Sequence, residues 1–213
     1  MVEIIPAILV KTPEEFREAV HKLEPHAERV HLDIIDGVFA PNTTIQGFSE
    51  LSGLETPLAF DVHLMVSRPA DILEEWLKTK ADRFMVHIES EGDIKEIART
   101  IRGQNKQMRL ALNPETASQQ AEPYLDLVHL VQFMTVHPGF QGEEFLPEVL
   151  DKIKWFYQHH GHTPIAVDGG ITPETAADVA KAGATILVAG NYIINSADPT
   201  VAIQTLKDTC TTS

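Results

Sequence analysis

The stretch Arg29-Val30-His31-Leu32-Asp33-Ile34 decides the fold of this chain, because it combines the signals of a buried strand with polar groups at its end. Two similar stretches follow, FDVHLM at residues 60–65 and IAVDGG at residues 165–170. Short runs of β-branched and other apolar residues are typical of strands in a parallel sheet that is covered on both faces. Residues i and i+2 of a strand point to the same face, so His31 and Asp33 point the same way.

Apolar runs alternate with amphipathic segments along the whole chain. We predict eight strands, over Glu3–Leu9, Val30–Ile35, Leu58–Leu64, Arg83–Ile88, Met108–Leu112, Leu127–Val136, Pro164–Val167 and Thr185–Ala189. Helices are expected after the Thr-Pro pairs at residues 12–13 and 172–173, over Pro69–Thr79, Asp93–Arg102, Leu146–His159 and Pro199–Lys207, and more briefly after Thr116. Eight strands alternating with helices favour an α/β fold, a closed (β/α)8 TIM barrel, with residues 1–213 forming a single domain.

Composition and charge argue against several classes of partner. The net charge of −14 disfavours nucleic acid and anionic membranes, which both attract basic patches. The first residues, Met1–Pro6, lack the basic region and cleavage site of a signal peptide, and no apolar run is long enough to span a membrane. A single cysteine, Cys210, cannot pair within the chain. We therefore expect a cytoplasmic protein that binds neither nucleic acid nor membranes. The sequence leaves its oligomeric state open, with a homo-oligomer as one alternative.

Four polar residues lie at or next to the carboxyl ends of predicted strands, where TIM barrels place their active sites. They are His31, Asp33, His63 and Asp168. Each could be an isolated buried polar residue or a helix cap, but together they would form a site for one divalent metal ion. Mixed nitrogen and oxygen ligands suit Zn, Fe, Mn or Co. The two carboxylates would also be two potential bases around a substrate.

Glycine-rich loops follow the last three predicted strands. They are Gly139-Phe140-Gln141-Gly142, Gly169-Gly170 and Gly190-Asn191. Glycine lets the backbone approach an anion closely, and the loops after strands seven and eight are the usual phosphate site of this barrel. Each glycine could also be required only for the conformation of its turn, but three such loops on adjacent strands favour phosphate binding. These loops contain no arginine or lysine, so backbone amides would hold the phosphate.

Several motifs, in this order along the chain, resemble those of the ribulose-phosphate 3-epimerase family. They are Pro6-Ala7-Ile8-Leu9, His31-Leu32-Asp33-Ile34-Ile35-Asp36-Gly37, Pro41-Asn42, Asp61-Val62-His63-Leu64-Met65, Leu112-Asn113-Pro114, Val136-His137-Pro138-Gly139-Phe140 and Val167-Asp168-Gly169-Gly170-Ile171. The resemblance implies a phosphate-binding barrel of the pentose phosphate pathway. It also implies that His31, Asp33, His63 and Asp168 bind the metal, and that Asp33 and Asp168 are the catalytic acid/base pair. The expected substrate- and phosphate-binding residues are Ala7, Met65, His137, Gly139, Phe140, Gln141, Gly142, Gly169, Gly170, Gly190 and Asn191.

Four positions depart from the family pattern. Ala7 replaces a serine, Ile35 a methionine, His137 an asparagine, and Asn191 the serine of a Gly-Ser pair. None of the four is an expected metal ligand. The departures therefore affect the identity of the substrate more than the type of reaction.

The resemblance implies a metal-dependent 3-epimerase of a ketose phosphate that interconverts ribulose 5-phosphate and xylulose 5-phosphate. Inversion beside a carbonyl requires one base to remove a proton from one face and an acid to return it to the other. Asp33 and Asp168 come from strands three places apart around the barrel, so they can flank a substrate. A divalent cation beside the carbonyl and hydroxyl oxygens would stabilise the enediolate between these steps.

Three alternatives remain at this stage. The first is the same chemistry on a related hexulose 6-phosphate. The second is a lyase of the phosphate-binding barrel superfamily, but its Asp-x-Lys-x-x-Asp motif is absent from residues 33–36. The third is a non-catalytic sugar-phosphate-binding barrel, which would not need two bases. His87 and Glu89 lie in register at the end of the fourth predicted strand, and we expect them to have a structural role or to support the metal ligands.

Overall fold

The computed structural model describes residues 2–211. Its strands are β1 (Glu3–Ile8), β2 (Arg29–Ile35), β3 (Ala59–Met65), β4 (Arg83–His87), β5 (Gln107–Leu112), β6 (Val131–Met134), β7 (Ile165–Asp168) and β8 (Ile186–Ala189). Its helices are α1 (Pro13–Leu23), α2 (Phe48–Ser52), α3 (Ala70–Leu77), α4 (Ile94–Gly103), the 3₁₀ segment η1 (Ser118–Leu127), α5 (Val149–His160), α6 (Pro173–Lys181), α7 (Asn191–Ile194) and α8 (Pro199–Thr211).

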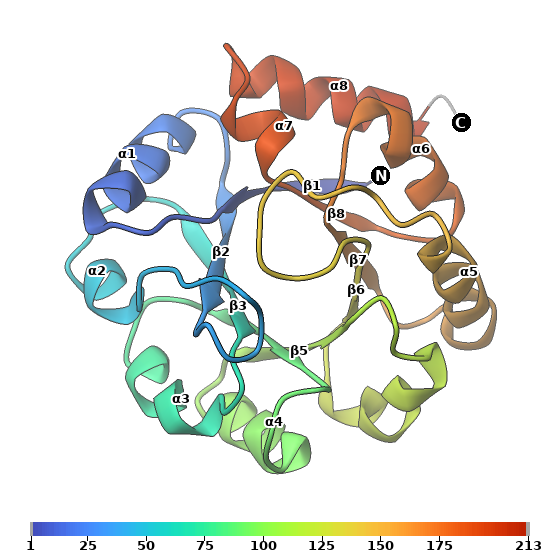
Figure 1. Cartoon of the computed structure of the whole chain (residues 1–213), viewed down its shortest axis with the longest axis horizontal. Coiled ribbons are helices and arrows are strands. Elements are labelled where there is room, and N and C mark those ends of the chain that lie inside the picture. Colours follow the sequence, from blue (N-terminus) through green and yellow to red (C-terminus); the bar gives the residue numbers. More distant parts are fainter. Residues whose placement is uncertain (1, 212–213) are drawn as a thin grey trace.

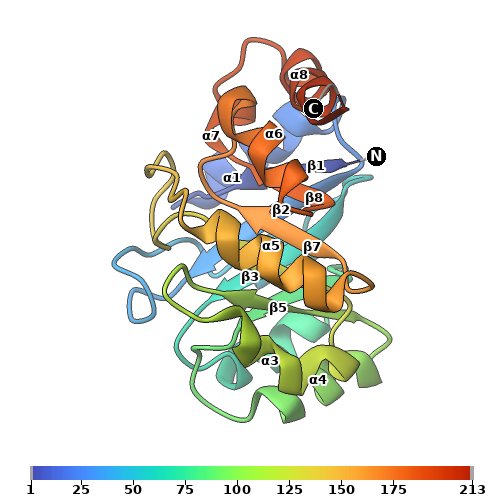
Figure 2. The same ribbon diagram turned by 90° about the vertical axis from the view of Figure 1, so that its right-hand side faces the viewer.

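The strands close into a barrel in the order β1 to β8, and every neighbouring pair, including β1 with β8, is parallel. Helices surround this barrel (Figure 1), and α5 and α6 lie outside β7 when the molecule is turned by 90° (Figure 2). The predicted (β/α)8 TIM barrel in a single domain is confirmed. The loops that follow β2 and β6 project from the same end of the barrel, its carboxyl end (Figure 2).

Local signals explain where the first helix begins. The hydroxyl of Thr12 accepts a hydrogen bond from the backbone N–H of Glu15, and the Glu15 carboxylate accepts one from the backbone N–H of Thr12. This capping box satisfies amides that have no partner inside the helix. The side chains of Phe16, Val20 and Leu23 on the inner face of α1 are buried against the barrel. Burial of such side chains contributes about 1.5–3 kcal/mol each.

The structure corrects one predicted strand and adds two short helices. We predicted a strand over Leu127–Val136, but β6 spans only Val131–Met134, and η1 extends to Leu127. Most residues from 127 to 136 are apolar, so the hydrophobic pattern alone does not show where the strand begins or ends. Helices α2 and α7 have five and four residues, which is too short to show a helical period in the sequence.

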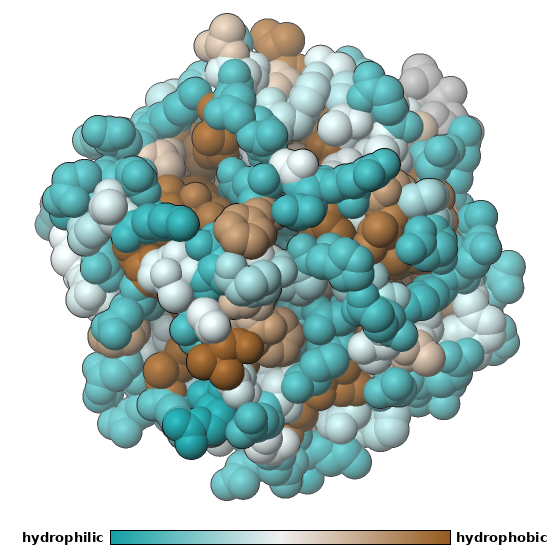
Figure 3. All heavy atoms as spheres, viewed as in Figure 1, coloured by the Kyte–Doolittle hydropathy of each residue, from teal (hydrophilic) through white to brown (hydrophobic). Residues whose placement is uncertain are grey.

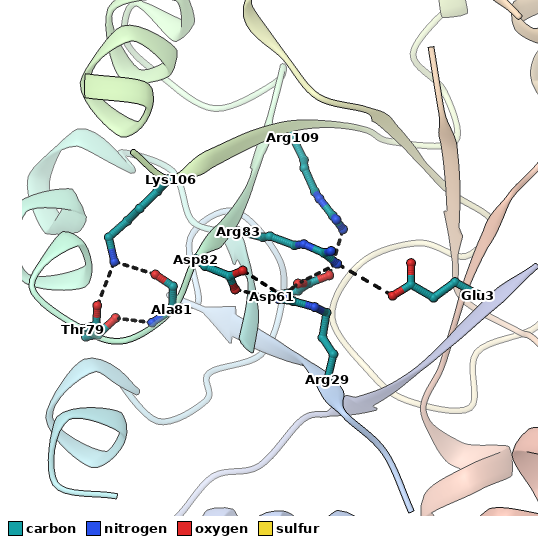
Figure 4. Close-up of polar contacts among 9 residues, drawn as sticks. All are labelled: Glu3, Arg29, Asp61, Thr79, Ala81, Asp82, Arg83, Lys106 and Arg109. Atoms are coloured by element: carbon teal, nitrogen blue, oxygen red, sulfur yellow. Dashed lines mark hydrogen bonds and ion pairs between the residues drawn. The ribbon is translucent and has the colours of Figure 1, made fainter. Parts of the chain in front are cut away.

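A network of charged side chains fills the amino end of the barrel (Figure 4). Asp61 of β3 has a fully buried side chain, and its carboxylate accepts hydrogen bonds from Nη1 of Arg29 at 2.7 Å and Nη1 of Arg109 at 2.8 Å. Nη1 of Arg83 lies 3.6 Å from the same carboxylate. Arg29 also binds both oxygens of Asp82, at 2.6 and 2.9 Å. Positive and negative groups thus meet inside this end of the barrel.

Within residues 2–211, no helix is both long enough and apolar enough to cross a lipid bilayer.

Candidate metal centre and active site

The four predicted metal ligands meet at the carboxyl end of the barrel. His31 and Asp33 come from β2, His63 from β3 and Asp168 from β7, and strand register places Asp33 directly beside His63. All four residues are buried, and one potential ligand atom of each lies within 4.8 Å of those of the others. This cluster could hold a metal ion.

The distances inside the cluster are those of groups that face a common point. Nδ1 of His63 lies 3.1 Å from Oδ1 of Asp33 and 3.3 Å from Oδ2 of Asp168. Nε2 of His31 lies 3.3 Å from the same two oxygens. Despite these distances, neither ring nitrogen of His31 has a partner with hydrogen-bond geometry, although the side chain is fully buried. A buried polar atom without a partner is rare in folded proteins and points to a missing ligand.

The pKa shifts in the cluster indicate that positive charge beside its two carboxylates is favourable. Burial opposes the charged form of His31, yet the neighbouring carboxylates of Asp168 and Asp33 outweigh it and raise the pKa of His31 to about 10. The same balance raises the pKa of His63. Burial opposes ionisation of Asp168, but the two imidazoles hold the pKa of its carboxyl well below its usual value. Two buried carboxylates therefore need positive charge beside them, supplied here by protons on histidine.

The donor set fits a divalent cation. Imidazole nitrogens and carboxylate oxygens are ligands of Zn²⁺ and of other first-row divalent ions. Such an ion would replace the protons as the positive charge between Asp33 and Asp168, and it would give Nε2 of His31 a partner. The chemistry of these four side chains and the unpartnered nitrogen thus agree with the sequence prediction.

Gln132 is a contact of the cluster that the sequence analysis missed. It lies on β6 with a fully buried side chain, and its Nε2 donates a hydrogen bond to Oδ2 of Asp168 at 3.1 Å. Its Oε1 has no partner. The available signal was a glutamine inside the apolar run Val131–Met134, since a buried amide requires hydrogen bonds.

His87 of β4 also reaches the cluster. Its Nε2 lies 2.8 Å from Nε2 of His63, and its Nδ1 lies 3.1 Å from Oε2 of Glu89. Burial lowers the pKa of His87 to about 4, against the opposing effect of Glu89. The expectation that these two residues support the metal ligands agrees with these contacts.

A cavity of about 700 Å³ opens above the cluster, a size typical of small-molecule sites. On the face viewed in Figure 3, hydrophobic side chains gather near the middle and a mostly hydrophilic surface surrounds them. Asp33 and Asp168 line the cavity, and so do ten of the predicted binding residues: Ala7, Met65, Gly139, Phe140, Gln141, Gly142, Gly169, Gly170, Gly190 and Asn191. Among the described residues that line it, none is an arginine or a lysine.

Two of the glycines lie where the backbone requires them. Gly169 and Gly170 have φ values of +112° and +62°, in the region that favours glycine. A Cβ atom on Gly170 would lie 2.8 Å from Cβ of Phe145, and one on Gly169 would lie 2.4 Å from Cγ2 of Val136. These glycines therefore let the loop after β7 pack closely against the loop after β6.

The four departures from the family pattern occupy different surroundings. Ala7 and Asn191 line the cavity, and the side-chain oxygen of Asn191 accepts a hydrogen bond from Nδ2 of Asn195. Ile35 is buried beside Met65 in a small apolar cluster. His137 is not among the residues lining the cavity; its side chain is 66% exposed, and its Nδ1 lies 2.9 Å from Oε1 of Glu115. A contact between His137 and substrate stays a prediction.

Fold and site together define a class: a (β/α)8 barrel with a buried two-histidine, two-carboxylate cluster beneath a cavity rimmed by glycine loops. Sequence comparison makes this more specific, since the sequence model of the ribulose-phosphate 3-epimerase family matches residues 3–194. The chain belongs to the ribulose-phosphate 3-epimerase family, and its enzyme class is that of the isomerases.

Individual relatives agree with this assignment. The ribulose-phosphate 3-epimerase of Bacillus subtilis is 34% identical over 214 residues, which cover 97% of this chain and 99% of the relative. That of Treponema pallidum is 38% identical over 195 residues, covering 88% and 89%. A 3-hexulose-6-phosphate synthase from Salmonella typhimurium has a similar structure, with a TM-score of 0.70 at 14% identity over 99% of both chains. At that identity, the last comparison shows a shared fold alone.

Proposed function

We propose that this protein is a divalent-metal-dependent 3-epimerase that interconverts ribulose 5-phosphate and xylulose 5-phosphate. The observation that carries the proposal is the meeting of Asp33 and Asp168, from β2 and β7, with two buried histidines beneath the cavity. Family membership supports the same reaction. His31, Asp33, His63 and Asp168 would hold the ion.

The two carboxylates would exchange the proton at C3 of the substrate. Asp33 serves one face and Asp168 the other, so that one accepts the proton and the other returns a proton from the opposite side. A bound divalent ion would supply the positive charge that stabilises the negative charge developing on the substrate oxygens. Met65 and Met134, which are buried and line the cavity, would limit the access of water to the reacting carbon.

The phosphate of the substrate would lie at the end of the cavity formed by the loops after β6, β7 and β8. Gly142, Gly170, Gly190 and Asn191 line that end. Backbone amides would hold the anion there, in keeping with the lack of basic residues among the described lining residues and with the net charge of −14. A preference between pentulose and hexulose phosphates would be set at three positions that differ from the family pattern, Ala7, His137 and Asn191.

The mechanism is tested by turnover in D₂O with the variant Asp168→Asn. The parent protein is expected to place deuterium at C3 of the product, because the returning proton comes from a base that exchanges with solvent. Loss of one acid/base group is expected to slow epimerisation by about 10²–10⁴-fold. Asp178→Asn, at an exposed position on α6, is the matched control and is expected to turn over like the parent.

Metal content is measured beside the rate, because asparagine keeps an oxygen that can bind the ion. Near-parental turnover of metal-loaded Asp168→Asn would rule out the two-base mechanism. A double variant, His31→Ala with His63→Ala, is expected to lose the ion, and unchanged metal affinity in that variant would contradict the proposed ligands. A panel of ketose phosphates then identifies the preferred substrate.

A further inference from the structure

The imidazole of His63 connects the cluster to two residues behind it. Its Nδ1 faces Asp33 and Asp168, whereas its Nε2 lies 2.8 Å from Nε2 of His87. The two ring planes differ by only 15° and their centroids lie 5.0 Å apart, so the rings meet edge to edge. Both side chains are fully buried, which leaves the hydrogen bond out of reach of bulk water.

The chain of hydrogen bonds ends on an anchored carboxylate. Nδ1 of His87 lies 3.1 Å from Oε2 of Glu89. The other oxygen of Glu89 accepts a hydrogen bond from the backbone N–H of Asn113 at 2.8 Å and another from the hydroxyl of Thr116. The ring of Phe39 packs on His87, with centroids 4.6 Å apart. These contacts hold His87 and Glu89 in one arrangement.

The Glu89 carboxylate fixes which group donates in each of these hydrogen bonds. An ionised carboxylate only accepts, so Nδ1 of His87 must carry a proton and donate it to Glu89. A hydrogen bond between two ring nitrogens needs one donor and one acceptor. Nε2 of His87 is then the acceptor, and Nε2 of His63 is the donor. A neutral His63 with its proton on Nε2 has a free lone pair on Nδ1, the atom that faces the cluster.

We infer that His87 and Glu89 are positioning residues that fix His63 in the one tautomer able to bind a divalent cation through Nδ1. This inference rests on the proposed function, because it takes His63 as a ligand. Partners of this kind, behind the ligands, typically contribute about 10–100-fold to metal affinity. Neither residue needs to contact the substrate.

The variant Glu89→Gln tests the direction of the hydrogen bonds that link Glu89, His87 and His63. Its amide oxygen is expected to accept from Asn113 and Thr116 as before, which turns the NH₂ group toward Nδ1 of His87. That nitrogen must then accept, so the proton of His87 moves to Nε2 and points at His63. Nε2 of His63 becomes the acceptor, and its proton moves to Nδ1. This arrangement blocks the lone pair that faces the cluster.

Zn²⁺ affinity is measured by competition with a chromophoric chelator, using protein freed of metal by dialysis. Glu89→Gln is expected to bind Zn²⁺ about 10–100-fold more weakly than the parent. The matched control is Glu91→Gln, an exposed position on the same loop, which is expected to bind like the parent. Long-range ¹H–¹⁵N spectra of the metal-free proteins report the tautomer of His87 directly: the proton is expected on Nδ1 in the parent and on Nε2 in Glu89→Gln.

A second pair of variants at one position keeps the test decisive if Glu89→Gln folds poorly. His87→Phe preserves the ring that packs on Phe39 but offers no acceptor to His63. His87→Gln offers a carbonyl to His63 and an NH₂ group to Glu89, which is the parental direction. We expect His87→Phe to lose Zn²⁺ affinity and His87→Gln to regain most of it.

The outcomes separate the two proposals. Parental Zn²⁺ affinity in folded Glu89→Gln and His87→Phe would overturn the positioning role, as would an unchanged His87 tautomer in Glu89→Gln. Failure of the parent to bind Zn²⁺ or another divalent ion would instead overturn the proposed metal site. In that case the tautomer spectra still decide whether His87 and Glu89 orient His63.

Discussion

Replacing Asp61 by asparagine would remove a fully buried negative charge from the amino end of the barrel without changing the shape of the side chain. The substitution acts mainly on Arg109, whose side chain is only 4% exposed and whose Nη1 binds Asp61 at 2.8 Å. Burial lowers the pKa of Arg109 to about 10, against the attraction of Asp61. Arg29 would keep its two hydrogen bonds to Asp82. The principal result is therefore one buried guanidinium without a counter-charge.

The expected loss of folding stability follows from this single buried guanidinium that loses its partner. Removing one member of a buried ion pair typically costs about 3–5 kcal/mol, because the other charge stays buried. Asparagine keeps an oxygen that can accept one hydrogen bond, so we expect the lower end, about 3 kcal/mol. In a chain of this size that loss corresponds to a decrease in Tm of about 6–12 °C. Asp82→Asn, whose side chain is 48% exposed, is the control and is expected to lose about 1 kcal/mol or less.

The assay is urea unfolding, followed by circular dichroism and by the fluorescence of the fully buried Trp76. A double variant that adds Arg109→Met removes the uncompensated charge, and we expect it to recover most of the lost stability. Zn²⁺ affinity and turnover below the unfolding transition should stay parental, because Asp61 pairs with Arg29, Arg83 and Arg109 rather than with residues of the cluster. The reasoning is refuted if Asp61→Asn costs less than about 1 kcal/mol, or if the double variant is no more stable than the single one.

Two further predictions concern the cavity and its carboxylates. Gly190→Ala is expected to raise KM about tenfold with little change in kcat or Zn²⁺ affinity, since the new methyl group enters the phosphate end of the cavity. The backbone can accept alanine here, because φ of Gly190 is −89°. The atom nearest to the new methyl group, at 2.8 Å, is Nε2 of Gln141, at the end of a flexible side chain. A parental KM would contradict the phosphate placement. Gln132→Leu is expected to lower kcat about tenfold through the lost charge-assisted hydrogen bond to Asp168, without loss of stability, because its Oε1 already lacks a partner. Unchanged kcat in a metal-loaded Gln132→Leu protein would show that this hydrogen bond has no part in turnover.

The fold and the cluster could be predicted because both depend on short-range pattern. Alternating apolar runs and amphipathic segments reveal eight strands, and the rule that strand ends meet at one face of a barrel unites His31, Asp33, His63 and Asp168. These residues are recognisable singly, as polar groups that end apolar runs. Nothing about their distant partners has to be known in advance.

Partners that lie inside a strand or come from distant strands could not be predicted in this way. Gln132 stands within an apolar run, and its contact with Asp168 depends on the pairing of β6 with β7. Asp61 lies in a stretch that the sequence analysis quoted for its histidine alone. Its partners Arg29 and Arg109 come from β2 and β5, and only the closed barrel brings them together.

Strand β3 therefore contributes residues to two polar layers inside the barrel, and the two layers differ in how the charge of their carboxylates is balanced. Asp61 and His63 are two residues apart and point to the same side of the strand, into the barrel. Around Asp61 the chain supplies its own counter-charges through Arg29, Arg83 and Arg109, so that layer needs nothing from solution. Around His63 the two carboxylates face imidazoles and the neutral amide of Gln132, and the described residues lining the cavity include no arginine or lysine. A buried layer whose positive charge comes only from protons on imidazoles can exchange those protons for a cation from outside, and this difference distinguishes the candidate metal centre from the structural network beneath it.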